Sequence, residues 1–258
     1  MENKVSLTDG FERYNLDKSG NYKLESSVVG DSYIEITLKE EGKINLDIKV
    51  EEGERTLVLL NSSVCDTEIE IKAEIDKDSV LKLGYIELSS NKTNLKSLVL
   101  LNKEGAYAEF KTATVCNTDK KYDIETVHVN PHTKGLMENY GVVYNEASLD
   151  IVCAGRINKD SYRSDSRQAT RVLTFGNPKN IRVLPILYID NNDVAASHAT
   201  SIGQPDAEAL YYMESRGLTK EEAIALMANG YLTPVCKMIK DETLREETEK
   251  RITERVEG

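Results

Sequence analysis

Residues 44–50 read Ile-Asn-Leu-Asp-Ile-Lys-Val, and residues 68–75 read Glu-Ile-Glu-Ile-Lys-Ala-Glu-Ile. In both stretches an apolar side chain alternates with a polar one, which is the period of a β-strand with one buried face. The same pattern recurs in five further runs, at residues 33–38, 81–88, 107–115, 122–129 and 149–157. The sequence therefore predicts a body of short strands from about residue 33 to residue 190.

Two all-β architectures fit such a series of strands, a β-sandwich and a β-solenoid. A sandwich favours tight hairpins whose turns are often Asn-Gly or Asp-Gly. The chain contains only two such dipeptides, Asp9-Gly10 and Asn229-Gly230, and neither separates two strand runs. This favours a solenoid, while the lack of a strict internal repeat leaves the sandwich open.

A helical pattern replaces the strand pattern toward the C-terminus. Residues 206–217 begin with acidic side chains and end in Arg-Gly, which are start and stop signals of a helix. Thr219 and Glu222 form the capping box of a second helix, which we expect to end at Asn229-Gly230. A third, highly charged helix is expected from about residue 234 to residue 256.

These patterns divide the chain of 258 residues into three parts. We expect a short N-terminal segment at residues 1–25, a β core at residues 26–204 and a C-terminal helical region at residues 205–258. A chain of this length can bury a sizeable core.

The charge balance limits the partners of the protein. Its 33 Lys and Arg against 44 Asp and Glu give a formal net charge of −11. This surplus repels phosphate backbones, so we expect no nucleic-acid partner. No apolar run approaches the roughly 20 residues that a membrane helix needs, and residues 1–10 lack the apolar core of a secretory signal. We expect a cytoplasmic protein without membrane contact.

The four cysteines are Cys65, Cys116, Cys153 and Cys236, and no two of them form a Cys-x-x-Cys pair. This spacing argues against a zinc knuckle or a redox dithiol built within this chain alone. We expect free thiols, often buried. Cys153 falls on the alternating apolar face of residues 149–157 and should face the core.

Two histidines, His128 and His132, have the spacing of a helical metal site. Pro131 and the strand pattern of residues 122–129 argue against a helix there. On a strand, residues four apart lie about 13 Å from each other at ~3.3 Å per residue. We expect a turn with surface histidines rather than a metal site.

A polar, basic stretch follows a strand at residues 155–157 and 161–168. Its arginines and hydroxyl groups could bind a phosphate. No glycine-rich nest or helix N-terminus accompanies them, which excludes a P-loop. The expected structure is a solvated turn with local ion pairs.

A third histidine, His198, ends a polar segment directly before the predicted helices. A histidine at such a change of backbone can be held rigidly while it faces a partner. A Ser–His–Asp hydrolase is not supported, because the chain has no Gly-x-Ser-x-Gly nucleophile elbow. A lone histidine is often structural, yet this stretch is where we expect the function to lie.

The order of motifs around His198 resembles the SufB/SufD family of iron–sulfur cluster assembly scaffold proteins. Residues 197–203 match the family motif Ser-His-x-x-x-hydrophobic-Gly. The motif aromatic-x-x-x-Arg-Gly-hydrophobic follows at residues 212–218, and then come Glu221-Glu222-Ala223 and Asn229-Gly230-Tyr231-Leu232. Upstream the resemblance continues through His128, Thr133, Gly141-Val142, Gly155-Arg156-Ile157, Asp165-Ser166-Arg167-Gln168 and Arg171-Val172-Leu173. It covers about residues 121–235.

The resemblance implies a mainly β fold, a right-handed parallel β-helix followed by C-terminal helices, and so favours the solenoid. SufB-like members carry a cysteine in the segment before the histidine motif. Here no cysteine lies between Cys153 and Cys236, and residues 186–197 offer Asp and Asn instead. The chain is therefore similar to SufD-like members, or to short members that pair with themselves.

The resemblance also implies a function: a scaffold that assembles and transfers a transient Fe–S cluster, not an enzyme. Two subunits, this chain and either a SufB-like paralogue or a second copy, would meet along their β-helix ends. The residues implied at the joint are Ser197, His198, Asp190 and Asp193. His198 would bind iron beside ligands of the partner, and Cys153 is the other candidate ligand. A SufC-type ABC ATPase would dock on the helices at Tyr212, Arg216, Gly217, Gly230 and Tyr231. ATP would be bound only by this partner and not by the chain itself.

Two alternatives remain. The chain could be a structural adaptor of the ATPase that never contacts iron. It could also be a β-solenoid enzyme acting on polysaccharide, for which its 13 Tyr offer stacking surfaces, although a secretion signal would then be expected.

Overall fold

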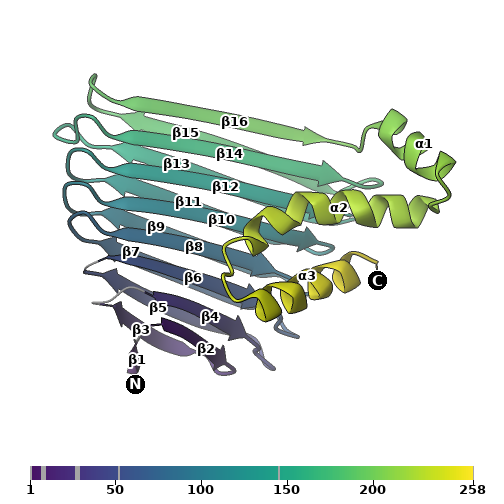
Figure 1. Cartoon of the computed structure of the whole chain (residues 1–258), viewed down its shortest axis with the longest axis horizontal. Helices are drawn as coiled ribbons and strands as arrows, with labels where there is room; N and C mark the ends of the chain where they lie inside the picture. Colours follow the sequence, from purple (N-terminus) through teal and green to yellow (C-terminus); the bar gives the residue numbers. More distant parts are fainter. Residues whose placement is uncertain (1, 7–9, 27–29, 52, 145, 258) are drawn as a thin grey trace.

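The computed structural model describes the whole chain except residues 1, 7–9, 27–29, 52, 145 and 258. Its body consists of two eight-stranded sheets (Figure 1). The odd sheet contains β1 (Glu2–Ser6), β3 (Gly20–Ser26), β5 (Gly42–Val50), β7 (Thr67–Ile75), β9 (Thr93–Leu101), β11 (Lys120–His128), β13 (Ser148–Ile157) and β15 (Asn180–Ile189). The even sheet contains β2 (Gly10–Leu16), β4 (Gly30–Ile36), β6 (Glu54–Asn61), β8 (Val80–Glu87), β10 (Tyr107–Cys116), β12 (Lys134–Val143), β14 (Asp165–Thr174) and β16 (Ala195–Gly203).

The chain alternates between the two sheets, so each turn adds one strand to each sheet. The pairings within each sheet are parallel, for example between β7 and β9 and between β12 and β14. This confirms the solenoid and excludes the sandwich, because a sandwich needs antiparallel pairs. Its right-handedness stays a prediction. Strands β1 and β2 already lie within residues 1–25, where the sequence suggested a separate segment.

The alternation of apolar and polar residues along each strand determines which side chains pack inside the solenoid. In β7 the inward residues are buried and most of the outward ones are exposed. Because the strands are parallel and in register, inward side chains stack into ladders. One ladder contains the buried residues Ile44, Ile69, Leu95, Tyr122 and Ile151. Removing such stacked apolar surface from water stabilises the fold by roughly 25 cal/mol per Å².

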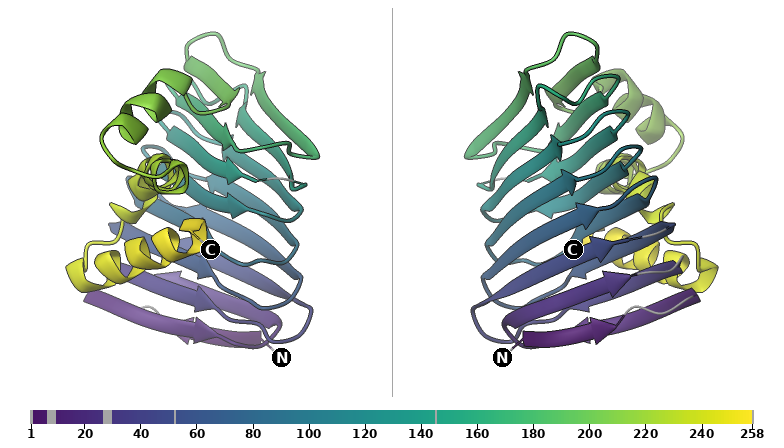
Figure 2. Two further views of the ribbon diagram at one scale, coloured as in Figure 1. Left: turned by 90° about the vertical axis from the view of Figure 1, so that its right-hand side faces the viewer. Right: turned by 90° about the vertical axis from the view of Figure 1, so that its left-hand side faces the viewer.

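Three helices follow the solenoid: α1 (Ala207–Ser215), α2 (Lys220–Cys236) and α3 (Glu242–Glu257). The predicted capping box is confirmed, since Glu222 N donates to Thr219 Oγ1 (3.2 Å) and Thr219 N donates to Glu222 Oε2 (2.7 Å). Helix α2 packs against the outer face of the even sheet, and α3 lies beside it (Figure 2). None of the described helices is long and apolar enough to cross a membrane.

The boundary predicted between the second and third helices is wrong. Helix α2 does not end at Asn229-Gly230 but continues to Cys236, and α3 begins at Glu242. A glycine inside a helix costs about 1 kcal/mol relative to alanine. Burying Leu232 and Val235 against the even sheet stabilises the last turns by roughly 1.5–3 kcal/mol each. Packing therefore outweighs the stop signal.

Helix α3 is fastened to early turns of the solenoid. Its inward residues Leu244, Thr248, Ile252 and Val256 are buried. Arg251 Nη2 lies 2.8 Å from Glu35 Oε1 of β4, and Arg255 Nε donates to the carbonyl of Leu88 (2.9 Å). The C-terminal helix thus contacts parts of the solenoid that precede it by more than 150 residues.

Candidate functional site

The solenoid ends in a turn that nothing in the described chain covers. We call β15, β16 and the loop between them (residues 190–194) the open end. All nine residues of β16 are exposed, whereas most of its neighbour β14 is half-buried or buried. The free edges of β15 and β16 present unpaired backbone groups, which another strand can bind.

His198 lies within β16, and the polar segment predicted to end at this histidine includes the first residues of that strand. Its register partner on β14 is Gln168, followed along the sheet by Met137 and Phe110. These three side chains face the interior and are buried. His198 therefore stands on the inward row of the sheet, but it is exposed because the solenoid stops there. Ser197 lies on the opposite row, beside Arg167.

The other predicted joint residues lie on the same open end. Asp190 is exposed, and its amide donates to the carbonyl of Ile157 (3.0 Å). Asp193 Oδ2 lies 3.7 Å from Arg163 Nε, with more than two thirds of both side chains exposed. Such exposed pairs contribute little to stability. The structure thus places all four predicted residues on the exposed last turn, although Ser197 lies on the outer face of β16 and His198 on its inward row.

Apolar side chains on this surface were missed by the sequence analysis. Leu184, Tyr188, Ile189 and Ile202 have 38–46% of their surface exposed. Ile189 and Ile202 stand on the uncovered inward rows. Leu184 and Tyr188 lie on the outer face of the odd sheet, where Arg156 covers the Tyr188 ring at 4.2 Å. The signal was present, because residues 183–189 form an almost continuous apolar run (Val-Leu-Pro-Ile-Leu-Tyr-Ile) at the end of an otherwise alternating solenoid. An apolar run on an edge strand indicates an interaction surface.

Cys153 does not share that surface. It faces the core, as the alternation predicted, and has no exposed surface. Its Sγ lies 3.7 Å from Met137 Sδ, and burial raises the pKa of the thiol to about 12. Burial likewise raises the pKa of Cys116 and Cys236 to about 12. All four cysteines are free, as expected, and Cys65 is partly buried.

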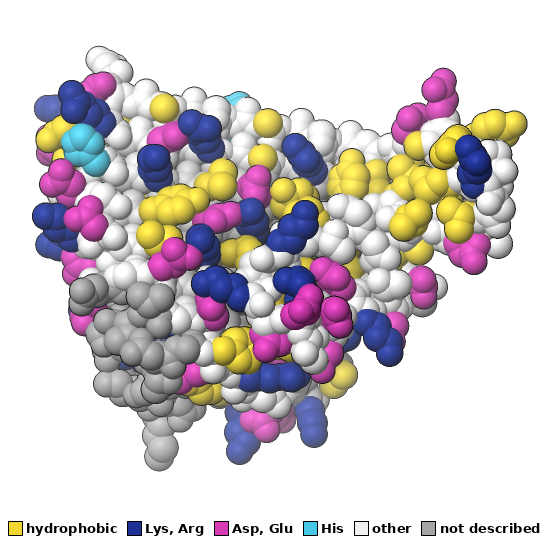
Figure 3. Space-filling model, viewed as in Figure 1, with side chains coloured by type: hydrophobic (Ala, Val, Ile, Leu, Met, Phe, Trp, Pro, Cys, Tyr) yellow, Lys and Arg dark blue, Asp and Glu magenta, His cyan; other side chains and the backbone are white. Residues whose placement is uncertain are grey.

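Helix α1 projects beside the open end and buries none of its residues. Tyr211 and Tyr212 are 73% and 57% exposed, and yellow apolar side chains gather on this helix in Figure 3. Arg216 stacks over the Tyr212 ring at 5.1 Å, and Gly217 adopts a φ of 99° that favours glycine. The other two residues predicted for the ATPase lie on α2, where Gly230 is exposed and Tyr231 packs against the core under the helices.

The prediction of surface histidines is wrong for His128. It is the last residue of β11, has no exposed surface and lies on the same inward row as Tyr122. Counting in twos from Tyr122 would have placed it inside. His132 does lie in a turn, with a φ of 58° and its ring 5.4 Å from that of Tyr162. The described residues contain no group of three or more metal-ligating side chains.

The stretch at residues 155–168 is only partly solvated. Ser161, Ser164, Ser166 and Gln168 are buried, contrary to the prediction of a solvated turn. The local ion pairs are present, for example between Arg167 and Asp165 (2.8 Å). Strand β14 starts at Asp165 and turns every second side chain inward, which buries Ser166 and Gln168.

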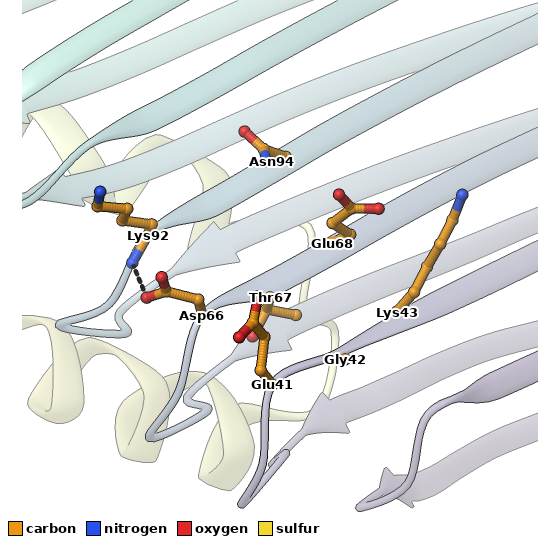
Figure 4. A pocket seen from close by; sticks show the side chains of 8 residues that line it. All are labelled: Glu41, Gly42, Lys43, Asp66, Thr67, Glu68, Lys92 and Asn94. Carbon is orange, nitrogen blue, oxygen red and sulfur yellow. Dashed lines mark hydrogen bonds between the residues drawn. The ribbon is translucent and has the colours of Figure 1, made fainter.

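A hollow on the outer face of the odd sheet offers a second concave surface (Figure 4). Its charged side chains are of both signs and include Glu41, Lys43, Asp66, Glu68 and Lys92. Lys43 already pairs with Glu70 (2.5 Å) and Lys92 with Asp119 (3.7 Å). Thr67 is the hydroxyl among its lining residues, and it donates to the carbonyl of Cys65 (3.1 Å) rather than to a carboxylate, so the hollow shows no activated nucleophile.

Comparison with known proteins agrees with this geometry. A family model described as "SUF system FeS cluster assembly, SufBD core domain" matches residues 12–231. SufD of Bacillus subtilis is 34% identical over 150 residues, which cover 57% of this chain and 33% of that protein. SufD of Escherichia coli is 26% identical over 106 residues (40% and 25%). A SufBD family protein of Mycobacterium leprae is 23% identical over 242 residues (88% and 62%).

The chain spans less than two thirds of the length of each of these relatives. The family match nevertheless covers most of the solenoid, the open end and the first helices. The chain therefore belongs to the SufBD core-domain family of the SUF system for iron–sulfur cluster assembly.

Proposed function

We propose that this protein is a scaffold component that assembles and passes on an Fe–S cluster at its open end. The observation that carries the proposal is the exposure of His198 on a terminal strand whose outer edge is unpaired. The cluster is cargo in this scheme, so the chain acts as a scaffold rather than as an enzyme. Its four free thiols suit a reducing compartment, and we place it in the cytoplasm.

Pairing of the open end with a second subunit is the first part of the proposal. A partner's edge strand can add to β16 through main-chain hydrogen bonds, while Ile189 and Ile202 on the uncovered inward rows supply apolar contact. The partner is a SufB-like paralogue or a second copy of this chain. Either arrangement would bury the apolar surface and bring the partner's residues close to His198.

Cluster binding is the second part. A neutral imidazole is a suitable iron ligand. The thiols of Cys116, Cys153 and Cys236 are buried and held protonated by raised pKa values, so His198 needs ligands from the partner. The proposed cluster is therefore shared across the joint.

The third part is an ATPase of the SufC type docked on α1 and the adjoining part of α2. Helix α1 contributes nothing to the core, yet it exposes two tyrosines and an arginine. These residue types dominate binding energy in protein interfaces. ATP hydrolysis by the partner would then act on helices directly connected to β16.

The test is anaerobic reconstitution of the chain with its ATPase and partner subunit, followed by measurement of iron and sulfide per complex. We expect His198→Ala to lose most of the cluster while size-exclusion chromatography shows an intact complex. His132→Ala, at a histidine in the loop between β11 and β12, two turns below the loop of the open end, is the control and should retain the cluster. An equal cluster yield with His198→Ala would contradict the ligand role. A complex that binds the ATPase but never takes up iron would favour the structural adaptor instead.

A further inference from the structure

A pocket of about 590 Å³ lies where α2 begins and α3 ends, beside the loops that follow β12 and β14. We call it the helix-end pocket. Both helix ends are on the right in Figure 1, the side on which the even strands end. Its volume is within the range of roughly 300–1,000 Å³ that is usual for ligand sites. None of its lining residues belongs to α1, so it is distinct from the proposed ATPase contact on that helix.

Apolar side chains from the sheet and from both helices line the pocket. Tyr144 and Phe175 directly follow β12 and β14, which pair in parallel, and their rings stack with centroids 5.5 Å apart. Tyr144 Oη donates to the carbonyl of Val256 (3.4 Å), which ties this ring to α3. Ile224 of α2 and Val256 supply the aliphatic part of the lining. The apolar wall is therefore held in place from three sides.

The charged residues that line the pocket are acidic: Glu221, Glu222 and Glu257. Their side chains are exposed. Glu222 Oε2 accepts the amide of Thr219 in the capping box, whereas Glu221 and Glu257 have no hydrogen bond or ion pair within the described residues. The dipoles of the two helix ends oppose each other there, because α2 contributes its positive end and α3 its negative end. The carboxylates therefore make the pocket attractive to a cation.

The chain itself shows how an arginine packs on an aromatic surface of this kind. Arginines cover three of its rings at 4.2–5.7 Å from the ring centroid, namely those of Tyr33, Tyr188 and Tyr212. Among the described residues no cation covers the rings of Tyr144 or Phe175 in this way. Arg255, a cation whose charge acts on Tyr144, donates to the carbonyl of Leu88 and does not line the pocket. The aromatic wall is therefore left without the cation that the other rings have.

We propose that the helix-end pocket binds an arginine side chain that a partner protein presents. A guanidinium is planar, stacks on aromatic rings and forms paired hydrogen bonds with carboxylates, and the pocket offers both groups. Lysine matches less well, because an ammonium is more strongly hydrated. Free arginine is disfavoured, because its α-carboxylate would lie close to three glutamates, whereas an arginine within a chain carries no such charge. The proposal depends on neither the cluster nor the ATPase.

Titration of the isotope-labelled protein with two small probes, followed by NMR, tests the chemistry of the pocket. N-acetylarginine amide represents an arginine within a chain, and N-acetylcitrulline amide has the same shape without the charge. We expect saturable shifts of the amides of Phe175, Gly176 and Ile224 with the arginine probe, and about tenfold weaker binding of the citrulline probe. Equal binding of the two probes, or no saturable shift, would overturn the proposal. Free arginine that binds as tightly as its amide would assign the pocket to a small metabolite and so would also overturn it.

Charge variants test whether the probe binds in the pocket. Glu221→Gln combined with Glu257→Gln removes two lining charges from exposed positions and should weaken binding of the arginine probe roughly fivefold or more. The matched control combines Glu246→Gln with Glu254→Gln, which removes two exposed charges of α3 that do not line the pocket. This control should bind the arginine probe as the wild type does. Equal weakening in both double variants would show attraction to the net charge of the protein rather than a site, and unchanged binding in the first would contradict the role of the glutamates.

Discussion

Glu87 and Lys120 form an ion pair inside the solenoid, with Lys120 Nζ 3.2 Å from Glu87 Oε1 and no exposed surface on either side chain. The pair joins the end of β8 to the start of β11. Burial, together with the adjacent Glu87 carboxylate, raises the pKa of Tyr85 well above 10, so its hydroxyl stays a donor to Glu87. The remaining contacts come from Asn61, Ser89, Asn91 and Thr93. The charges are thus fully satisfied without solvent.

Lys120→Met tests how much this ion pair contributes to the free energy of unfolding. The substitution leaves a buried carboxylate without its cation, which costs about 3–5 kcal/mol in comparable pairs. Denaturant unfolding measures the loss. Lys92→Met is the control, because the Lys92–Asp119 pair is largely exposed and exposed pairs contribute about 0–1 kcal/mol. Equal losses for the two variants would contradict the role assigned to the buried pair.

His128 should make stability depend on pH. Burial lowers its pKa from 6.5 to about 4, because the interior disfavours imidazolium. Between these values the unfolded chain binds a proton that the folded chain does not. The stabilising contribution of the neutral His128 to the free energy of unfolding is therefore complete above pH 6.5. It falls by about 3 kcal/mol as the pH drops to 4 and changes no further below that pH.

Unfolding free energies measured from pH 7 to pH 4 would show this dependence. His128→Asn should have a shallower slope than the wild type, and His132→Asn should keep the wild-type slope. Parallel curves for the wild type and His128→Asn would show that the imidazole is not buried as described.

Ile202→Lys examines the open end. The side chain is 46% exposed, so a charge there should leave the unfolding midpoint nearly unchanged. In the proposed joint the lysine would be desolvated, and association with the partner subunit should weaken at least tenfold. Analytical ultracentrifugation measures this. Val64→Lys, at a residue 71% exposed on a distant turn, should leave association intact. Loss of association in both variants would point to a surface other than the open end.

Tyr212→Ala addresses the proposed ATPase contact. Helix α1 has no buried residue, so the free energy of unfolding should change by less than about 0.5 kcal/mol. Truncating an interface tyrosine commonly costs about 2 kcal/mol or more, and calorimetry should show weaker binding of the ATPase by tenfold or more. Tyr162→Ala, which is 45% exposed elsewhere, should bind as the wild type does. If Tyr212→Ala bound the ATPase with unchanged affinity, α1 would not be part of the docking surface.

Sequence alternation predicts strands well where one face is solvated. The runs at residues 44–50 and 68–75 lie within β5 and β7 as expected. Strand β6 was not recognised, because its inward residues pack in the solenoid while outward residues such as Val58 and Leu60 pack under the helices. A strand buried on both faces loses its alternation. The end of α2 was misplaced for a related reason, since the sheet that stabilises its last turns is distant in sequence.

The candidate site was predictable only in part. The motif order located Ser197 and His198, yet their place on an uncovered final strand follows from the count of turns, which no local pattern contains. The interior of the last turns was also not predictable in detail. Glu87, Lys120 and Gln168 are polar residues whose types indicate a surface, and only their register on inward rows shows that they are buried.

A stack of turns in which each contacts only its neighbours has no intrinsic reason to unfold all at once, and it would be expected to fray from its uncovered end. Helix α3 changes that expectation. It connects the end of the chain to early turns of the solenoid by three side-chain contacts. These are Arg251 with Glu35, Arg255 with the carbonyl of Leu88, and Thr248 with Tyr33. These turns are therefore held together by contacts outside the stack, so loosening of the open end should not spread to them.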